Sequence, residues 1–210
     1  LDYWNAVCTA CQRLWAENPA ARATVQGVAV TTQRGTMINL GADGQPLRPA
    51  ITWLDQRRTD TVPPIGAFWR LAFTLAGVSP TLNYFRGEPE DNWIQAHQPD
   101  VWAQTHKYVM LSGYLNHRLC GSFIDSIGPQ VGYLPFDYKR LAWAGTKARK
   151  WQTLAVKPER PPELLAPGTR MGRTHPPASS APGIPDGTPQ IAAAAAPACT
   201  VTAAGCPATP

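Results

Sequence analysis

One apolar run constrains the fold of this chain more than any other segment. Residues 25–30, Val-Gln-Gly-Val-Ala-Val, are apolar on both faces of an extended strand. Such a strand belongs in the interior of a sheet that is covered on both sides. Residues 36–40 form a second run that leads into Ala42-Asp43-Gly44, a hairpin-turn signal. We expect these two runs to pair in one sheet, with a third candidate strand at 50–54 nearby.

Helical periodicity surrounds these strands. Over residues 3–17, apolar side chains recur at i, i+3, i+4 and i+7, which predicts an amphipathic helix ending near Asn18-Pro19. Helices after strands indicate an α/β class, with a helical region inserted at about 65–120. Within it, helices are expected at 66–75, 89–96, 99–104 and 106–119.

The end of the chain differs in composition from the rest. Of the 22 prolines, 12 lie between Pro158 and Pro210, and no aromatic residue follows Trp151. The last 24 residues carry no charged side chain. Such Pro/Ala-rich sequence is typical of disordered extensions, and we expect poor order at 197–210.

Composition also excludes several function classes. The net charge of +5 is scattered, and its densest cluster is Lys147, Arg149 and Lys150, so no basic stripe for nucleic acid is present. No apolar run approaches the roughly 18 residues of a membrane span. Five cysteines are an odd number and favour reduced thiols in the cytoplasm over a disulfide framework.

Metal and nucleotide motifs are weak or missing. Cys8-x-x-Cys11 has no second pair at zinc-ribbon spacing, and His117-x-x-Cys120 lies about a hundred residues away. Neither a phosphate-binding P-loop nor a G-x-G-x-x-G motif occurs. We therefore expect no metal site.

Polar residues follow two of the candidate strands. Gln33 and Arg34 come directly after the 25–30 run, where ligands bind in α/β folds, and their donors suit the hydroxyls of a polyol; a solvated loop is the alternative. Asp55 and Arg57 follow the 50–54 run, where they either pair with each other or face a ligand. Asp125 follows a short apolar run, where a turn cap is its ordinary role.

The order of these segments resembles the FGGY family of carbohydrate kinases over essentially the whole chain. Three stretches carry the resemblance: the strand and loop at 25–36, Asp-Gly-Gln-Pro-Leu-Arg-Pro-Ala-Ile-Thr-Trp-Leu-Asp-Gln-Arg at 43–57, and the segment 107–125, which ends in Arg-Leu-Cys-Gly and Asp125. Weaker matches continue to Cys206.

The resemblance implies a ribonuclease-H-like, actin-type ATPase fold and phosphorylation of a sugar or polyol hydroxyl by ATP and Mg²⁺. It implies substrate contacts at Gln33, Arg34, Gly35 and Tyr84. It further implies that Asp55, Arg57 and Asp125 organise the wall of the cleft. Ala196 stands where the family has its general-base aspartate, and a methyl group cannot accept a proton.

We therefore expect residues 1–196 to form a partial kinase N-terminal domain. The family's first β-hairpin would precede Leu1 and its ATP-binding domain would follow Pro210, so we expect an inactive substrate-binding half that binds ATP poorly and sugar weakly. A homo-oligomer is compatible with this expectation. The alternative is a non-enzymatic protein-interaction module that keeps part of the kinase fold and uses exposed aromatic residues of the helices at 89–119.

Overall fold

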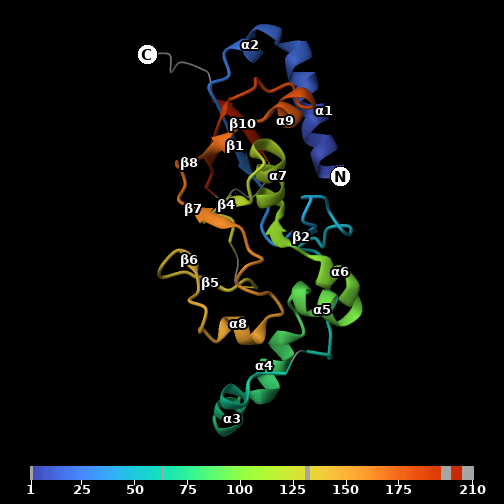
Figure 1. The fold of residues 1–210 in the computed structure, drawn as a ribbon, viewed down its shortest axis with the longest axis vertical. Helices are drawn as coiled ribbons and strands as arrows, with labels where there is room; N and C mark the ends of the chain where they lie inside the picture. The colour runs from blue at the N-terminus through green and yellow to red at the C-terminus, as the bar shows by residue number, and fades with distance from the viewer. Residues whose placement is uncertain (1, 63, 131–132, 195–199, 205–210) are drawn as a thin grey trace. The chain divides into compact units, whose positions relative to one another are not determined.

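A computed structural model describes residues 2–62, 64–130, 133–194 and 200–204 (Figure 1). The chain divides into two compact units, which are described separately below. Unit 1 comprises Leu1–Arg34, Met110–Pro129 and Pro162–Pro210, and unit 2 comprises Gly35–Val109 and Gln130–Pro161.

The centre of unit 1 is a four-stranded sheet in the order β10–β1–β9–β8. Strand β1 (Gly27–Thr31) pairs antiparallel with β10 (Thr200–Ala204) and parallel with β9 (Pro189–Ala192). Strand β8 (Arg170–Arg173) pairs antiparallel with the other edge of β9. Val28 is 1% exposed and Val30 is 5% exposed, which confirms the prediction that this run is an interior strand.

Four helices and a small parallel ribbon complete the described part of unit 1. The long helix α1 (Asp2–Glu17) buries Trp4, Cys8 and Cys11, the stripe that its periodicity predicts. Helix α7 (Leu111–Cys120) packs against the sheet strands β1, β8 and β9. The remaining elements are α2 (Pro19–Ala23), α9 (Pro176–Ser180), β4 (Ile124–Ser126) and β7 (Glu163–Leu165), the last two forming the parallel pair.

Unit 2 is built around a short β-pair. Strand β2 (Met37–Leu40) pairs with β3 (Lys107–Met110), the last residue of which is assigned to unit 1. After β2 the chain turns back through the predicted hairpin, where Gly41 N donates to Gln45 O at 2.9 Å. Ile51 then forms an antiparallel bridge with Met37.

Helices and one further ribbon make up the rest of the described part of unit 2 (Figure 1). Their buried side chains include Ile94, Trp102 and Phe136, and the Trp102 ring meets the Tyr108 ring edge-on at 5.4 Å. The elements are α3 (Ala67–Leu75), α4 (Ser79–Arg86), α5 (Glu90–His97), α6 (Pro99–Gln104), α8 (Lys150–Thr153), β5 (Phe136–Asp137) and β6 (Ala142–Trp143). Helices α3, α5 and α6 lie close to their predicted positions.

The structure corrects three sequence-based expectations about strands. Residues 106–119 are not one helix, because Lys107–Met110 forms β3 and α7 begins only at Leu111; Tyr108 and Val109 are strand-forming residues that pair with β2. In the described part of the chain, β1 and β2 lie in different sheets, because β9 and β10 occupy both edges of β1. The third strand at 50–54 shrinks to the Ile51 bridge, since Asp55 N donates to Thr52 O and closes a turn.

The Pro/Ala-rich end contains one described segment. Residues 200–204 form strand β10 beside β1. Residues 197–199 and 205–210 lie outside the described residues.

Candidate functional site

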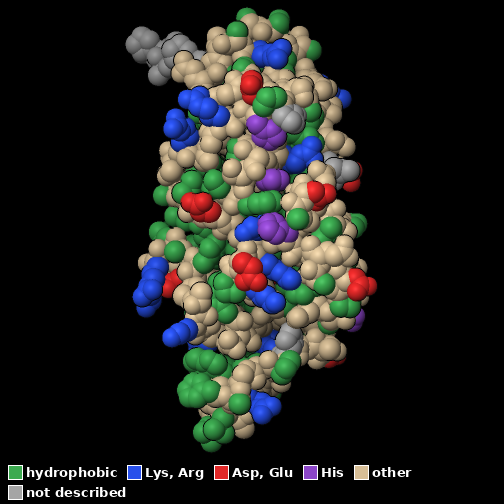
Figure 2. All heavy atoms as spheres, viewed as in Figure 1, with side chains coloured by type: hydrophobic (Ala, Val, Ile, Leu, Met, Phe, Trp, Pro, Cys, Tyr) green, Lys and Arg blue, Asp and Glu red, His purple; other side chains and the backbone are tan. Residues whose placement is uncertain are grey.

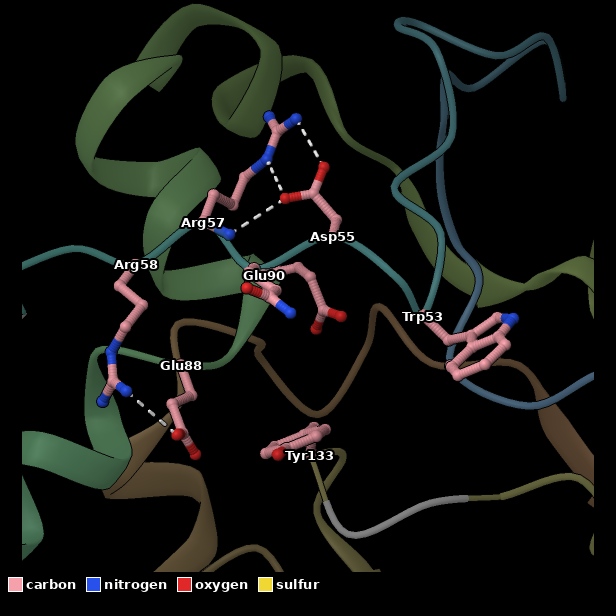
Figure 3. A pocket seen from close by; sticks show the side chains of 9 residues that line it. Trp53, Asp55, Arg57, Arg58, Glu88, Glu90 and Tyr133 are labelled. Carbon is pink, nitrogen blue, oxygen red and sulfur yellow. Dashed lines mark hydrogen bonds and ion pairs between the residues drawn. The ribbon is translucent and has the colours of Figure 1, made fainter.

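A cavity of about 390 Å³ opens in unit 2 where four segments of the chain meet (Figure 3). The loop after the Ile51 bridge contributes the largest share of its lining. The chain just before and at the start of α5 contributes two carboxylates. The lining residues are Gly35, Trp53, Asp55, Gln56, Arg57, Arg58, Glu88, Glu90 and Tyr133.

Asp55 and Arg57 form a two-pronged ion pair in the wall of this cavity. Arg57 Nε donates to Asp55 Oδ1 at 2.8 Å and Arg57 Nη2 donates to Oδ2 at 2.7 Å, while the Arg57 backbone amide also donates to Oδ1 at 3.0 Å. The guanidinium stacks 4.3 Å from the centre of the Trp93 ring. The hydrogen bonds from Arg57 hold the pKa of the Asp55 carboxyl below its usual value. The two residues pair, and both also face the cavity.

Arg58 makes a second pair beside the first. Its Nη1 donates to Glu88 Oε1 at 3.2 Å and its Nη2 donates to the backbone oxygen of Tyr84 at 2.8 Å. The guanidinium also lies 3.8 Å from the centre of the Tyr84 ring. Tyr84 thus contacts Arg58 and is not among the side chains that line the cavity, while its expected contact with substrate stays a prediction.

Gly35 allows the backbone to turn at the edge of the cavity. Its φ of +77° lies in the left-handed region that favours glycine. A Cβ added there would lie 3.2 Å from Trp53 Cβ. Glycine at this position thus keeps Trp53, 60% exposed, against the backbone and open to the cavity.

Glu90 is a cavity residue that sequence reasoning missed. It begins helix α5, and its side chain lines the same cavity as Asp55 and Arg57 (Figure 3). Burial raises the pKa of Glu90 to about 7, while its own backbone amide and Arg57 act in the opposite direction. A carboxyl of this kind changes charge near neutral pH. The run Glu88-Pro89-Glu90-Asp91 was the available signal, but acids in a first helical turn are ordinary.

Backbone contacts fix the two cavity walls against each other within unit 2. Thr59 N donates to Gly87 O at 3.0 Å, and a Cβ on Gly87 would meet Thr59 O at 2.7 Å. Behind the wall, the buried Asp91 accepts a hydrogen bond from Val156 N at 3.0 Å. Burial raises the pKa of Asp91 to about 6. These contacts join the segment that carries Glu88 and Glu90 to the loop that carries Arg57.

The other predicted site residues lie in unit 1 or outside the described residues. Gln33 and Arg34 follow β1 and end the first segment of unit 1, directly before Gly35. Asp125 is fully buried in β4, where it accepts hydrogen bonds from Ser112 Oγ at 2.8 Å and Asn116 Nδ2 at 3.2 Å. Ala196 lies outside the described residues.

The described residues show neither a metal-binding cluster nor a membrane-spanning helix. In the ranges that the structure describes, no group of three or more His, Cys, Asp and Glu side chains is arranged to hold a metal ion. None of the helices in those ranges is both long and apolar enough to cross a bilayer.

Comparison with known proteins decides the family. A family model described as "FGGY family of carbohydrate kinases, N-terminal domain" matches residues 2–202. This chain belongs to the FGGY family. The resemblance read from the sequence is thereby confirmed, and the α/β fold is the actin-like ATPase fold of FGGY sugar kinases.

Individual FGGY relatives agree with this assignment. An uncharacterized sugar kinase of Escherichia coli K12, YgcE, is 27% identical over 190 residues, which is 90% of this chain and 31% of that protein. The crystal structure of xylulose kinase from Rhodospirillum rubrum superposes with a TM-score of 0.66 at 18% identity, over 92% of this chain and 40% of that one. The crystal structure of gluconate kinase from Lactobacillus acidophilus superposes with a TM-score of 0.57 at 20% identity, over 79% of this chain and 33% of that one. The chain spans about a third of the length of the curated FGGY relatives it matches.

Proposed function

We propose that this chain is the sugar-binding part of an ATP-dependent carbohydrate kinase and that the cavity of unit 2 holds the sugar or polyol. One observation carries the proposal. Gly35 from the first family-like stretch and Trp53, Asp55 and Arg57 from the second come together around the same cavity. Residues separated in sequence thus supply one polar, partly aromatic pocket.

The lining chemistry suits a polyhydroxylated ligand. Sugar hydroxyls both donate and accept hydrogen bonds, and this cavity offers carboxylate acceptors beside guanidinium donors. The exposed faces of Trp53 and Tyr133 offer apolar surface for the C–H face of a sugar ring. The ion pairs keep Arg57 and Arg58 in fixed orientations, so little side-chain freedom is lost when a ligand binds.

Gln33 and Arg34 are proposed as further substrate contacts, and Asp125 as a residue that organises the wall of the cleft. The support for these three roles is the family resemblance together with the position of Gln33 and Arg34 directly after β1. Asp125 is buried among hydrogen bonds from α7, which suits an organising role rather than contact with a ligand.

Phosphoryl transfer in the family uses ATP with Mg²⁺. The described residues contain no donor set arranged for a metal ion, so they do not fit Mg²⁺ by themselves, and no step through it is assigned here. With Ala196 at the position of the general base, we expect no turnover by the 210-residue chain alone.

Two measurements test the proposed function. A coupled ADP-release assay with a panel of ketoses and polyols should show no sugar-dependent ATP consumption, and clear turnover would contradict the expected inactivity. Ligand-observed NMR with D-xylulose, xylitol and related sugars should show weak, millimolar binding. Arg34→Ala should weaken it about tenfold, since a charge-assisted hydrogen bond contributes about 1.5–3 kcal/mol. Arg13→Ala, on the exposed side of α1, is the matched control; equal signals from all three proteins would exclude a role for Arg34.

A protein-interaction role is the second candidate, favoured by one surface. Hydrophobic side chains gather over α3 and α4 (Figure 2), where Phe68 is 74% exposed and Leu75 is 79% exposed. Exposed aromatic residues were expected at 89–119, but Trp102 and Tyr108 in that range are buried. Sedimentation velocity of the wild type and Leu75→Glu tests self-association through α3; the same concentration-dependent behaviour in both would exclude that interface.

A further inference from the structure

We propose that Glu90 is a specificity-determining residue that makes the cavity select neutral sugars and polyols over anionic sugar acids. The inference rests on the proposed function, because it concerns the same cavity. It goes further by assigning a charge class to the ligand and a role to a residue outside the family-like stretches.

Both guanidinium groups of the cavity already have carboxylate partners. Arg57 places Nε and Nη2 on the two oxygens of Asp55 at 2.8 and 2.7 Å. Arg58 divides its donors between Glu88 and the backbone oxygen of Tyr84. Each guanidinium keeps further N–H donors that can reach a hydroxyl, but its positive charge is already balanced by a protein carboxylate, so a ligand carboxylate gains little net attraction from it. The cavity therefore lacks a ready cation for an acidic sugar.

Glu90 adds a carboxyl with no cation of its own. It makes no ion pair with any residue that the structure describes, although Arg57 is near enough to influence it. The cavity is thus lined by three carboxyl groups, Asp55, Glu88 and Glu90, and by two guanidinium groups. Its wall carries one excess negative charge when Glu90 is ionised, and a second anion placed there is repelled.

The same carboxyl suits a neutral ligand in either protonation state. An ionised Glu90 accepts a hydrogen bond from a sugar hydroxyl, and a protonated one donates to a hydroxyl oxygen. Burial, which disfavours the charged form, is what brings this group close to neutrality near pH 7. The charged and titratable groups that act on it are Asp55, Arg57, Asp91, Tyr108 and Tyr133.

Matched ligand pairs test the proposal. Each pair consists of a polyol and the aldonate of the same configuration: xylitol and D-xylonate, D-glucitol and D-gluconate, ribitol and D-ribonate. Affinities are measured by ligand-observed NMR titration at pH 8. For the pair whose polyol binds best, we expect the aldonate to bind at least tenfold more weakly to the wild type. In Glu90→Gln, which removes the charge and keeps the shape, we expect the difference to fall to threefold or less.

Two controls make the result specific. Glu159→Gln changes the same charge at an exposed position of unit 2 outside the cavity, and it should leave the tenfold difference intact. In the wild type, lowering the pH from 8 to 6 should protonate Glu90 and reduce the difference, since an aldonate remains ionised throughout. Glu90→Gln should show no such pH dependence, which separates Glu90 from the neighbouring Asp91. If Glu90→Gln does not fold, Glu90→Ala takes its place in the same titrations.

The outcomes are distinguishable. If neither polyols nor aldonates bind, the sugar site and this inference both fail. If the wild type binds polyol and aldonate equally, or if Glu90→Gln leaves the difference unchanged, the role of Glu90 is overturned while the sugar site stands.

Discussion

Arg57 meets Asp55 through two parallel hydrogen bonds of 2.8 and 2.7 Å, and the two residues are only two positions apart in the chain. The pair therefore closes a small loop on itself, in addition to stacking the guanidinium over Trp93. An arrangement of this kind stabilises the cavity wall in a single conformation before any ligand arrives.

Arg57→Ala should lower the free energy of unfolding by about 1–2 kcal/mol, because two charge-assisted hydrogen bonds and a ring contact are lost from a partly exposed site. Arg57→Lys should recover little, since an ammonium cannot form the fork. Urea titration followed by tryptophan fluorescence measures the effect. The control is Arg140→Ala, whose partner Asp137 lies 4.0 Å away on the surface, and it should change stability by less than about 0.5 kcal/mol.

The raised pKa of Glu90 predicts a pH-dependent stability difference. Its folded-state pKa of about 7 exceeds the ordinary 4.5, so the native state holds its proton more tightly than the unfolded chain. That contribution is complete below pH 4.5 and is lost as the pH rises through 7. Glu90→Gln should therefore gain stability over the wild type between pH 4.5 and 7.5, by up to about 3 kcal/mol. Denaturant titrations across this range test it, and a constant difference would contradict it.

Gly35→Ala should combine a backbone penalty with displacement of Trp53. The left-handed φ of Gly35 costs an alanine about 1 kcal/mol, and the new Cβ would contact Trp53 Cβ at 3.2 Å. Gly77→Ala is the matched control, because Gly77 has φ +68° and nothing within 4 Å of an added Cβ. Both variants should lose similar stability, but only Gly35→Ala should weaken polyol binding, by threefold or more. Equal polyol affinity of both variants would exclude a contribution of Trp53 to ligand binding.

Asp125→Ala should be the most destabilising substitution at the predicted site positions. The carboxylate is fully buried and accepts from Ser112, Asn116 and the Ser126 amide, so its loss removes the acceptor of these three hydrogen bonds. We expect a loss of about 3 kcal/mol, measured by thermal and urea unfolding. Glu163→Ala, at an exposed position on the neighbouring strand β7, should cost less than about 0.5 kcal/mol. A similar small cost at Asp125 would contradict a structural role for it.

The local hydrophobic pattern predicted much of this fold, because the spacing of apolar residues in a long periodic segment indicates which of its faces is buried. The helix at 3–17, the interior strand before Gln33 and the hairpin at 42–44 all follow from residues that are adjacent in the chain. Strand β3 was missed because its pairing with β2 depends on residues about 70 positions away, which no local window contains. For the same reason, the local pattern could not identify β9 and β10 as the partners of β1.

In the candidate site, too, residues in one short stretch could be predicted, whereas a residue whose role depends on distant segments could not. Asp55 and Arg57 were identified because they stand in one short stretch after an apolar run. Glu90 was missed because its role arises from a cavity wall that lies 35 residues earlier in the chain. Its proximity to Arg57 and its burial are consequences of tertiary packing, and these determine its protonation.

The partners of β1 have a consequence for how the chain is made. Val28 pairs with Gln190, and Val28 also faces Ala203 across the other edge, so both neighbours of this apolar strand are synthesised more than 160 residues later. At about 5–20 residues per second, a ribosome needs roughly ten to thirty seconds to supply them. During that interval the central strand of unit 1 has two open edges and an apolar surface on each face. While unit 1 is being synthesised, strand β1 is therefore an unpaired apolar segment of the kind that chaperones bind. Slow codons upstream of residue 189 would lengthen this interval.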